Sequence, residues 1–405
     1  MIRAAKCIAA ALWSQCAHKL QRKDTLFSSR LTIDDPAAAG QGRNLPGHSM
    51  RDQNDRDGLA LLGIWRFVLA SAVMASHLWN PAFPDAGRHA VAGFFVISGF
   101  LITKIANEVY AERPVEFVIN RFLRIYPTYW FCTALCIGIY HAFPETIKLP
   151  TGLATNYPST TFSWINNIAL VSYFKGNGLI IAQAWSLDIE ICFYLVIGLA
   201  TSRSRAITLV LFALTTIYSA LSVIGVTKFS FYFTPQSCAF LFFGGSVAYF
   251  YAPRVEASGS IVISAGVAYA VSMFVLPFMV SEAWGQVQSD LLLFLSGGAS
   301  VLLLLTLRQV NVRVGDTARE FFDWLGKLSY PVFLLHLFLT VPVASVIGVS
   351  NRPLLLVVTY AITIAVSAVI VRYIEAPVEV VRTWLRGSAS DVVRDKPMRT
   401  TSTVG

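Results

Sequence analysis

Two ionisable side chains lie inside an apolar segment that is long enough to cross a membrane. Residues 59–79 number 21, about the length that spans the hydrocarbon of a bilayer, and they include Arg66 and His77. Eleven residues of helix make about three full turns, so both side chains share one face, roughly 16 Å apart along the axis. An ionisable group at this depth is costly unless it faces a polar interior, so the pair predicts a functional site. The alternative is that Arg66 reaches the membrane surface and His77 ends the helix at the opposite interface.

A carboxylate occurs in a second apolar segment, WSLDIEICFYL. Ser186, Glu190 and Tyr194 recur every four residues, so they form one stripe of a helix. Glu190 needs a partner at this depth, and His77 is expected at the same end of the bundle. A carboxylate that accepts a hydrogen bond from one imidazole nitrogen leaves the other nitrogen free to take a proton. The pair therefore predicts general-base chemistry, with a purely structural ion pair as the alternative.

Two arginines lie three residues apart in RFLRIYP. Arg121 and Arg124 are therefore neighbours on a predicted helix. Planar guanidinium groups suit phosphate oxygens, so the two predict an anion clamp on the cytoplasmic side. The alternative is an interfacial helix whose arginines contact lipid headgroups. Pro127 follows, and we expect the third span to begin there.

Small and polar residues mark two further segments as candidate cavity walls. Ser98 and Gly99 lie in GFFVISGFLIT, where missing side chains serve either close helix packing or the lining of a cavity. His336 occurs in LSYPVFLLHLFL and is expected near the middle of the membrane. A single histidine among leucines is more often structural than catalytic, and we treat it as a cavity-lining candidate.

The composition is that of a membrane protein. Of 405 residues, 55% are hydrophobic and 14% are charged, whereas soluble domains have about 25% charged residues. Long apolar segments alternate with short polar ones, which predicts an all-α polytopic membrane helix bundle of about ten transmembrane helices. The expected spans are about 59–79, 89–108, 128–143, 179–200, 205–224, 232–251, 260–280, 290–308, 321–347 and 354–374.

The charges predict an orientation and exclude some functions. The formal net charge of +9 comes from short connections and the two tails. With the N-terminus inside, the inner loops hold more arginine and lysine than the outer ones, so both termini are expected in the cytoplasm. This distribution is unlike a nucleic-acid-binding face. The six cysteines show no CxxC pairing, and we expect neither a disulfide framework nor a metal site.

Three regions follow from these patterns. Residues 1–57 are polar and rich in charge, which predicts a disordered cytoplasmic extension. Residues 58–384 form the membrane domain, and residues 385–405 form a disordered basic tail. Met50 precedes the first span, so it is an alternative to Met1 as the start of translation. The long outer loop 144–178 is expected to dip back into the interface.

The motifs together resemble acyltransferase family 3, polytopic enzymes that decorate bacterial surface glycans. Four pieces carry the resemblance in order: Arg66 with His77, GFFVISGFLI, RFLRIYP and WSLDIEICFY. LSYPVFLLH and IEAP add weaker support, and the similarity covers about 59–384. The long N-terminal extension departs from the family pattern, as does Gln236, near a place where the family often has a basic residue.

The resemblance implies a bacterial inner-membrane enzyme. It would take an acyl group, commonly acetyl, from cytoplasmic acyl-CoA and deliver it to a hydroxyl of an exopolysaccharide, lipopolysaccharide or lipid-linked glycan outside. Arg121 and Arg124 would hold the phosphates of CoA. The thioester arm would pass Ser98 and Gly99.

The resemblance also implies how the transfer proceeds. His77, oriented by Glu190, would abstract the proton of the acceptor hydroxyl, or less readily carry the acyl group itself. Arg66 would steady the thioester or the developing oxyanion. The candidate contacts to the acceptor are Trp185, Ser186, Tyr194 and His336.

Two other functions fit part of the sequence. A membrane transporter or exporter of a polar or anionic solute would also need buried charges and a cavity. Transporters often carry inverted repeats with broken spans in matching positions, and this sequence has no such pairing. A non-catalytic scaffold that kept the fold is the second alternative. The sequence leaves open the acceptor sugar, the acyl chain, an acyl-enzyme step and the oligomeric state.

Overall fold

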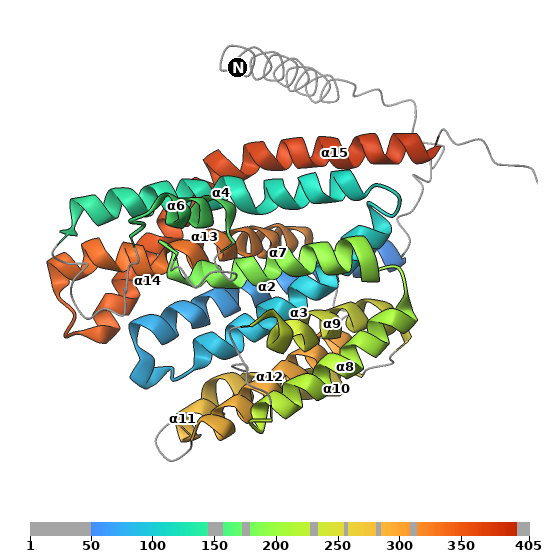
Figure 1. The fold of residues 1–405 in the computed structure, drawn as a ribbon, viewed down its shortest axis with the longest axis horizontal. Helices are drawn as coiled ribbons and strands as arrows, with labels where there is room; N and C mark the ends of the chain where they lie inside the picture. Colours follow the sequence, from blue (N-terminus) through green and yellow to red (C-terminus); the bar gives the residue numbers. More distant parts are fainter. Residues whose placement is uncertain are drawn as a thin grey trace, which may run out of the picture. The chain divides into compact units, whose positions relative to one another are not determined.

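The computed structural model describes residues 50–144, 157–171, 179–226, 234–254, 258–280, 285–307 and 314–394. These belong to one compact unit, Met50–Gly405. Figure 1 shows its long helices side by side as a bundle. Most of the predicted N-terminal extension lies outside the described residues.

The longer helices are α2 (Met50–Leu78), α3 (Ala86–Glu108), α4 (Pro114–Ala142), α7 (Trp185–Leu195), α8 (Arg205–Val223), α9 (Pro235–Tyr251), α10 (Gly259–Ala270), α12 (Gln286–Leu307), α13 (Asp316–Ile347), α14 (Arg352–Ile370) and α15 (Ala376–Arg394). The shorter ones are α6 (Thr161–Ala169) and α11 (Leu276–Val280). The π-helical turns Val196–Thr201, Val271–Val275 and Val371–Glu375 continue α7, α10 and α14.

The predicted all-α polytopic architecture is confirmed. Among the described residues, nine helical segments are long and apolar enough to cross a membrane. They correspond to nine of the ten predicted spans. The remaining predicted span is α9, which has 17 residues and is buried along most of its length. It packs against α3 on one side and α8 on the other.

Polar side chains cap several helices where they begin. The hydroxyl oxygens of Thr160, Ser204 and Thr234 accept hydrogen bonds from backbone N–H groups of the first turns of α6, α8 and α9. Asn351 does the same for α14. These bonds satisfy donors that have no partner within the helix, so the short polar connections fix where each helix starts.

Two glycines allow α2 and α13 to pack closely. A Cβ atom at Gly63 would lie 2.6 Å from the carbonyl oxygen of Phe322, and one at Gly326 would lie 2.8 Å from the Cα of Gly63. Backbones approach this closely only where a side chain is missing, a common arrangement between membrane helices. His77 of α2 and His336 of α13 also contact each other, and each lies C-terminal to the glycine of its own helix. The two helices therefore run parallel.

Gly99 has a similar role between α3 and α9. A Cβ atom at Gly99 would lie 2.0 Å from the carbonyl oxygen of Phe242, and one at Gly245 would lie 2.0 Å from that of Val96. The sequence left packing and cavity lining open for Gly99. The backbone contact shows that Gly99 serves packing, so its predicted place beside the thioester arm is wrong.

We expect Gly99→Ala to destabilise the protein by about 1–3 kcal/mol, because the backbone of α9 cannot turn aside as a side chain can. Gly138→Ala is the matched control, since among the described residues nothing lies within 4 Å of the added Cβ. Thermal unfolding of both variants in detergent micelles measures the difference. Equal stability of the two variants would contradict the packing role of Gly99.

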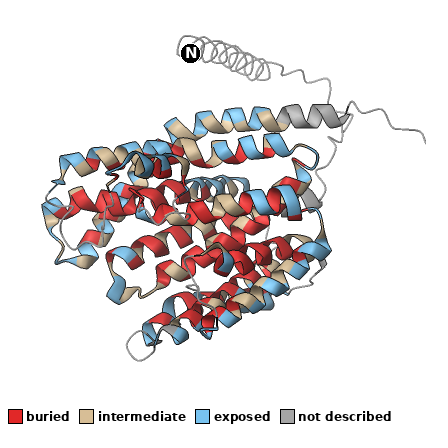
Figure 2. Ribbon diagram, in the orientation of Figure 1, coloured by how far each residue is buried: buried red, intermediate tan, exposed pale blue. Residues whose placement is uncertain are grey.

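Large apolar side chains are exposed on the outer helices. Val210, Leu214 and Ile217 of α8 are 56–58% exposed, and Ile263 of α10 and Val357 of α14 are more so. Figure 2 shows exposed residues on the outer faces of the bundle and buried ones toward its centre. Water would penalise an apolar surface of this extent, whereas lipid tails do not. The chain is a multi-pass membrane protein.

α4 is one continuous helix from Pro114 to Ala142. The prediction that the third span begins at Pro127 is therefore wrong. Proline removes one backbone donor, but membrane helices tolerate it because neighbouring groups can satisfy the freed carbonyl. Arg121 and Arg124 thus lie on the same helix as the third span.

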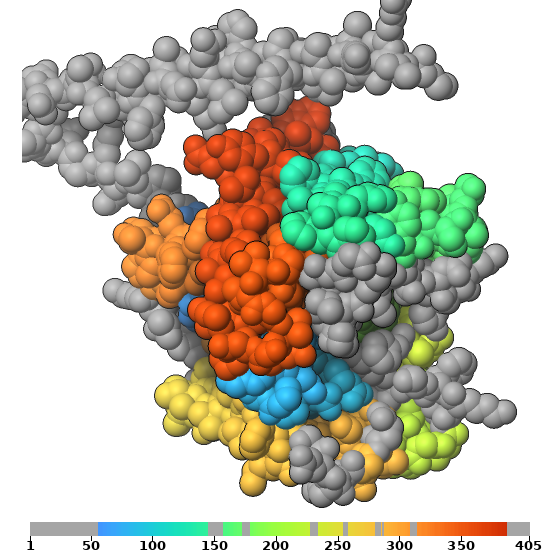
Figure 3. Space-filling view, turned by 90° about the vertical axis from the view of Figure 1, so that its left-hand side faces the viewer, coloured from blue at the N-terminus to red at the C-terminus, as the bar shows by residue number. Residues whose placement is uncertain are grey.

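The helices extend beyond both predicted ends of the membrane domain. α2 already begins at Met50, and Asp57, assigned to the extension, forms a 2.8 Å salt bridge with Arg319 of α13. α15 continues to Arg394 and so includes residues 385–394, which the sequence analysis assigned to the basic tail. α15 packs beside α4, and Figure 3 shows the chain of α14 and α15, in red, next to α4, in blue-green.

Part of the long outer loop returns to the bundle as α6. Three aromatic side chains of α4 donate hydrogen bonds of 2.8–2.9 Å to the last carbonyls of α6; the donors are Tyr126, Tyr129 and Trp130. The expectation that loop 144–178 dips into the membrane interface stays a prediction. Residues 145–156 and 172–178 lie outside the described residues.

Candidate active site

Two adjoining pockets lie between α2, α3, α4, α7 and α13, each enclosing about 470 Å³ of space including open solvent. The aromatic chamber is named for Phe94, Phe95 and Phe333, and the arginine chamber for Arg121 and Arg124. The two chambers share wall residues and therefore adjoin. The shared residues are Arg66, Ser98, Leu187, Glu190 and Tyr330.

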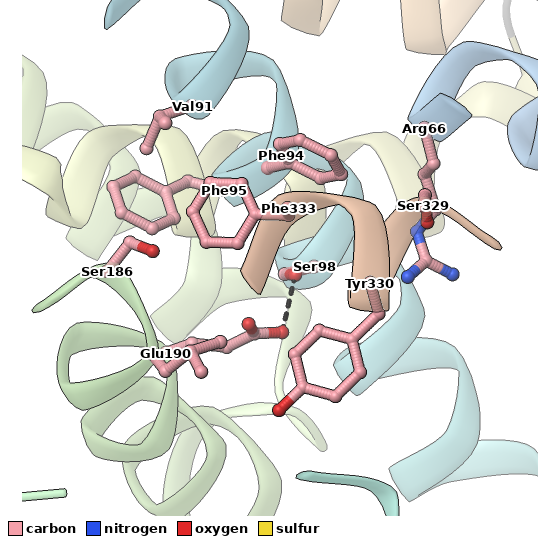
Figure 4. A pocket seen from close by; sticks show the side chains of 11 residues that line it. Arg66, Val91, Phe94, Phe95, Ser98, Ser186, Glu190, Ser329, Tyr330 and Phe333 are labelled. Carbon is pink, nitrogen blue, oxygen red and sulfur yellow. Dashed lines mark hydrogen bonds between the residues drawn. The ribbon is translucent and has the colours of Figure 1, made fainter. Parts of the chain in front are cut away.

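Glu190 lies at the junction of the two chambers. One of its oxygens, Oε1, accepts hydrogen bonds of 2.7 Å from both the Ser98 and the Tyr194 hydroxyls. In Figure 4 the Glu190 carboxylate points toward Ser98. Glu190 and Tyr330 both lie below the three phenylalanine rings in this view. Hydrogen bonds to a carboxylate are among the stronger ones, and a buried charge needs them. The predicted stripe of α7 therefore faces the cavity.

Two side chains complete the walls around this network. Arg66 lines both chambers, as Glu190 does, and adds a positive charge to their walls. Ser186, one turn before Glu190, lines the aromatic chamber. Trp185 is half-buried, and its ring meets that of Phe95 edge to face with 6.3 Å between centroids. Trp185 therefore supports the aromatic wall.

Arg121 turns into the bundle. It is 8% exposed, and its guanidinium lies over the Tyr194 ring, 5.5 Å from the centroid. Nη2 donates a 2.7 Å hydrogen bond to Asn120 Oδ1, while Nε has no hydrogen-bond partner among the described residues. A buried donor without a partner suits an anionic ligand. By contrast, the side chain of Phe122, the next residue, is 42% exposed.

Arg124 connects the arginine chamber to a third pocket. Its Nη1 lies 3.6 Å from Glu375 Oε2, and its guanidinium lies over the Tyr330 ring, 5.6 Å from the centroid. Because Arg121 and Arg124 both line the arginine chamber, the alternative of an interfacial helix with lipid-facing arginines is wrong.

The third pocket, also about 470 Å³, adds residues that the sequence interpretation missed. Arg382 and Lys327 line it together with Arg124. Arg382 donates a 3.5 Å hydrogen bond to Asn120 Oδ1 and pairs with Glu379. The sequence analysis placed Arg382 near the end of the membrane domain and gave it no role in the site. Its i,i+3 spacing from Glu379 was the signal that a helix continues there.

Tyr110 lies at the same end of the bundle, between α3 and α4. It is 2% exposed, and burial raises the pKa of its hydroxyl, against the effect of nearby arginines. Those arginines are Arg113, Arg121, Arg382 and Arg386. This end of the bundle therefore concentrates positive charge around the arginine chamber.

His77 has a different partner from the one predicted. Its Nδ1 lies 2.8 Å from Nε2 of His336, so the predicted pairing of His77 with Glu190 is wrong. His336 is fully buried, and its ring centroid lies 6.4 Å from that of Phe333, a wall of the aromatic chamber. His77 itself is exposed. The two histidines therefore lie one helical turn beyond the chamber wall.

Within the described ranges, no cluster of three or more histidine, cysteine or acidic residues could hold a metal ion.

Comparison with known proteins assigns the chain to a family. The family described as an acyltransferase domain, acyltransferase family 3, matches residues 60–372. The chain belongs to this family. The walls of both chambers lie inside the matched region, whereas Arg382 lies beyond it. The cavity is therefore part of the acyltransferase domain.

Two relatives share parts of the acyltransferase domain. The peptidoglycan O-acetyltransferase OatA of Listeria monocytogenes is 34% identical over 148 residues, which are 35% of this chain and 22% of OatA. The exopolysaccharide production protein ExoZ of Rhizobium meliloti is 30% identical over 119 residues, 27% of this chain and 33% of ExoZ. Each match thus spans a third or less of the relative. No solved structure matches the chain significantly.

Proposed function

We propose that this acyltransferase moves an acyl group, most simply acetyl, from cytoplasmic acyl-CoA to a hydroxyl of an extracytoplasmic polysaccharide or lipid-linked glycan. The acyltransferase domain supports the reaction class. The names of the two relatives, which concern peptidoglycan O-acetylation and exopolysaccharide production, support the acceptor class. We place the protein in a bacterial inner membrane with both termini inside.

One observation carries the proposal. The three pockets adjoin through shared walls: Arg124 joins the third pocket to the arginine chamber, and Glu190 joins that chamber to the aromatic one. The series begins among guanidinium groups and ends one turn from His336 and His77. A long donor with phosphates at one end and a thioester at the other fits such a series.

The arginine end would bind the phosphates of the donor. Arg121, Arg124 and Arg382 offer guanidinium donors from α4 and α15, and guanidinium forks match phosphate oxygens. Lys327 adds a positive charge at the third pocket. We therefore assign this end to the cytoplasm, where acyl-CoA is found.

The chambers would hold the thioester arm. Ser98 and Tyr330 line both chambers and offer hydroxyl groups to the amides of the arm. Arg66 lies eleven residues before His77, about 16 Å along the axis of α2, so the two cannot act on one carbonyl. We therefore assign Arg66 to the carbonyl oxygens of the arm and not to the oxyanion.

His77 would be the general base. Its Nε2 takes the proton of the acceptor hydroxyl while the hydroxyl oxygen attacks the thioester carbonyl carbon. The carbon–sulfur bond breaks, and the thiolate leaves with the proton that His77 returns. The ester remains on the glycan, and the histidine is neutral again.

The test uses the purified protein in liposomes together with cells. With labelled acetyl-CoA and a soluble glycan acceptor, we expect label in the glycan and release of free CoA thiol in equal amounts. Mass spectrometry of surface glycans from cells with and without the gene identifies the acceptor. Identical spectra under expression conditions, with no transfer in liposomes, would contradict the proposal.

Arg382→Gln is expected to raise KM for acyl-CoA about 3- to 10-fold, because one partly solvated contact to phosphate is lost. The value of kcat is expected to stay the same. Arg372→Gln is the matched control, since Arg372 is exposed shortly before α15. Steady-state kinetics at saturating acceptor measures both. An equal KM for the two variants would remove Arg382 from the donor site.

A further inference from the structure

A straight hydrogen bond joins the two histidines. His77 Nδ1 and His336 Nε2 are 2.8 Å apart. Each imidazole nitrogen lies about 1.1 Å from the ring centre, so a straight in-plane bond of this length separates the centroids by about 5 Å. The observed separation is 5.1 Å, with 11° between the ring planes. The rings therefore lie edge to edge, nearly coplanar.

The backbone of α13 decides which nitrogen of His336 carries hydrogen. Its Nδ1 lies 3.2 Å from the carbonyl oxygen of Val332. A carbonyl oxygen only accepts, so Nδ1 of His336 carries the hydrogen, and the opposite tautomer would set two lone pairs against each other. A neutral imidazole has one N–H group. Nε2 of His336 therefore carries a lone pair.

That lone pair fixes His77 in turn. Nε2 of His336 can only accept, so the hydrogen between the rings belongs to Nδ1 of His77. The single N–H group of neutral His77 is then bonded to His336, so Nε2 of His77 has the free lone pair. A carbonyl, a buried imidazole and an exposed imidazole thus form one directed chain.

The surroundings hold this chain in place. His336 and Val332 are both fully buried. Thr340, one turn beyond His336, donates its hydroxyl to the His336 carbonyl. The Nδ1 of His77 is bonded to His336, whereas the Glu190 carboxylate accepts hydrogen bonds from Ser98 and Tyr194 inside the cavity. His336 is therefore the group that sets the orientation of His77.

We propose that His336 is a positioning residue that holds His77 in the tautomer whose Nε2 accepts the proton of the acceptor hydroxyl. This inference rests on the proposed function. When His77 becomes an imidazolium, its Nδ1–H group stays bound to His336, which remains neutral. The proton on Nε2 is then free to pass to the leaving thiolate. A neutral imidazole here does the orienting that a carboxylate does in many other histidine-based sites.

Kinetics of two His336 variants test the role in catalysis. His336→Met keeps similar bulk without an acceptor, and we expect kcat to fall roughly 10²-fold or more. His336→Gln is expected to recover most of that loss, since its amide can accept from His77 and donate to Val332. KM for acyl-CoA is expected to be unchanged in both. Leu339→Met is the matched control at a buried site on the same helix.

A spectroscopic test does not depend on activity. In protein labelled with ¹⁵N-histidine, we expect hydrogen on Nδ1 of both His77 and His336, with His77→Gln and His336→Gln identifying their signals. His336→Met should give His77 a mixture of tautomers. Hydrogen on Nε2 of His77 in the unaltered protein would overturn the proposal, as would equal losses of kcat in both His336 variants. If the unaltered protein transfers no acyl group, the proposed function fails, while the tautomer is still measured.

Discussion

His77→Ala is expected to lower kcat for acyl transfer by roughly 10²- to 10⁴-fold, the usual contribution of a general base. His77 lies in the last turn of α2 and is exposed, so truncation leaves the packed core intact. The donor phosphates would bind far from this residue. KM for acyl-CoA is therefore expected to change little.

The control for His77→Ala is a second exposed histidine. His141 lies at the end of α4, and its ring hydrogen-bonds to Tyr157 at 3.1 Å. His141→Ala is expected to retain full activity. Rates of free thiol release and of label transfer, measured on monodisperse protein in liposomes, compare the two. A His77→Ala protein with normal kcat would leave the reaction without its proposed base.

Removal of both arginines of the arginine chamber is expected to raise KM for acyl-CoA about 100-fold or more. Each charge-assisted contact to a phosphate contributes about 1.5–3 kcal/mol, and Arg121 and Arg124 are close enough to act together. The variant is Arg121→Gln with Arg124→Gln. Glu375→Gln is added so that the partner of Arg124 is not left as an unpaired buried carboxylate.

The control for the arginine chamber removes an arginine elsewhere. Arg205 begins α8, is exposed and lies over the Phe250 ring at 5.9 Å. Arg205→Gln is expected to leave KM for acyl-CoA unchanged. Direct binding of CoA by calorimetry gives the donor affinity without turnover. If the triple variant binds CoA as tightly as Arg205→Gln does, the phosphate site lies elsewhere.

These outcomes also separate the enzyme from a transporter. A transporter would move solute without cleaving a thioester, so His77→Ala would have no thiol release to abolish. In the enzyme, the His77 and arginine variants affect different kinetic constants. That division follows from the geometry, because the series of pockets separates the arginines from the histidines.

The sequence by itself determined the class of the protein and most of the polar residues that line the two chambers. Hydropathy predicted the all-α membrane bundle, since apolar segments of this length have few other uses. Helical periodicity predicted that Glu190 and Tyr194 share a face and that Arg121 and Arg124 are neighbours. Both statements concern residues within one helix, where spacing alone fixes direction.

Only the tertiary structure decided which helices meet. His77 pairs with His336, 259 residues away, and not with Glu190. Arg382 returns to Arg124 because α15 continues as a helix beside α4. Gly99 packs on α9, whereas Ser98, one residue earlier, faces Glu190. Nothing in the local spacing distinguishes these outcomes from the ones predicted.

The physical reason is that lipid tails are as apolar as the side chains they surround. Hydropathy therefore predicts that a helix spans the membrane. It says little about which face of that helix contacts a neighbouring helix. Shape decides the neighbour, as where Gly63 and Gly326 let α2 and α13 approach. That contact aligns the two histidines, so the tautomer of the proposed base depends on two glycines more than ten residues away from it.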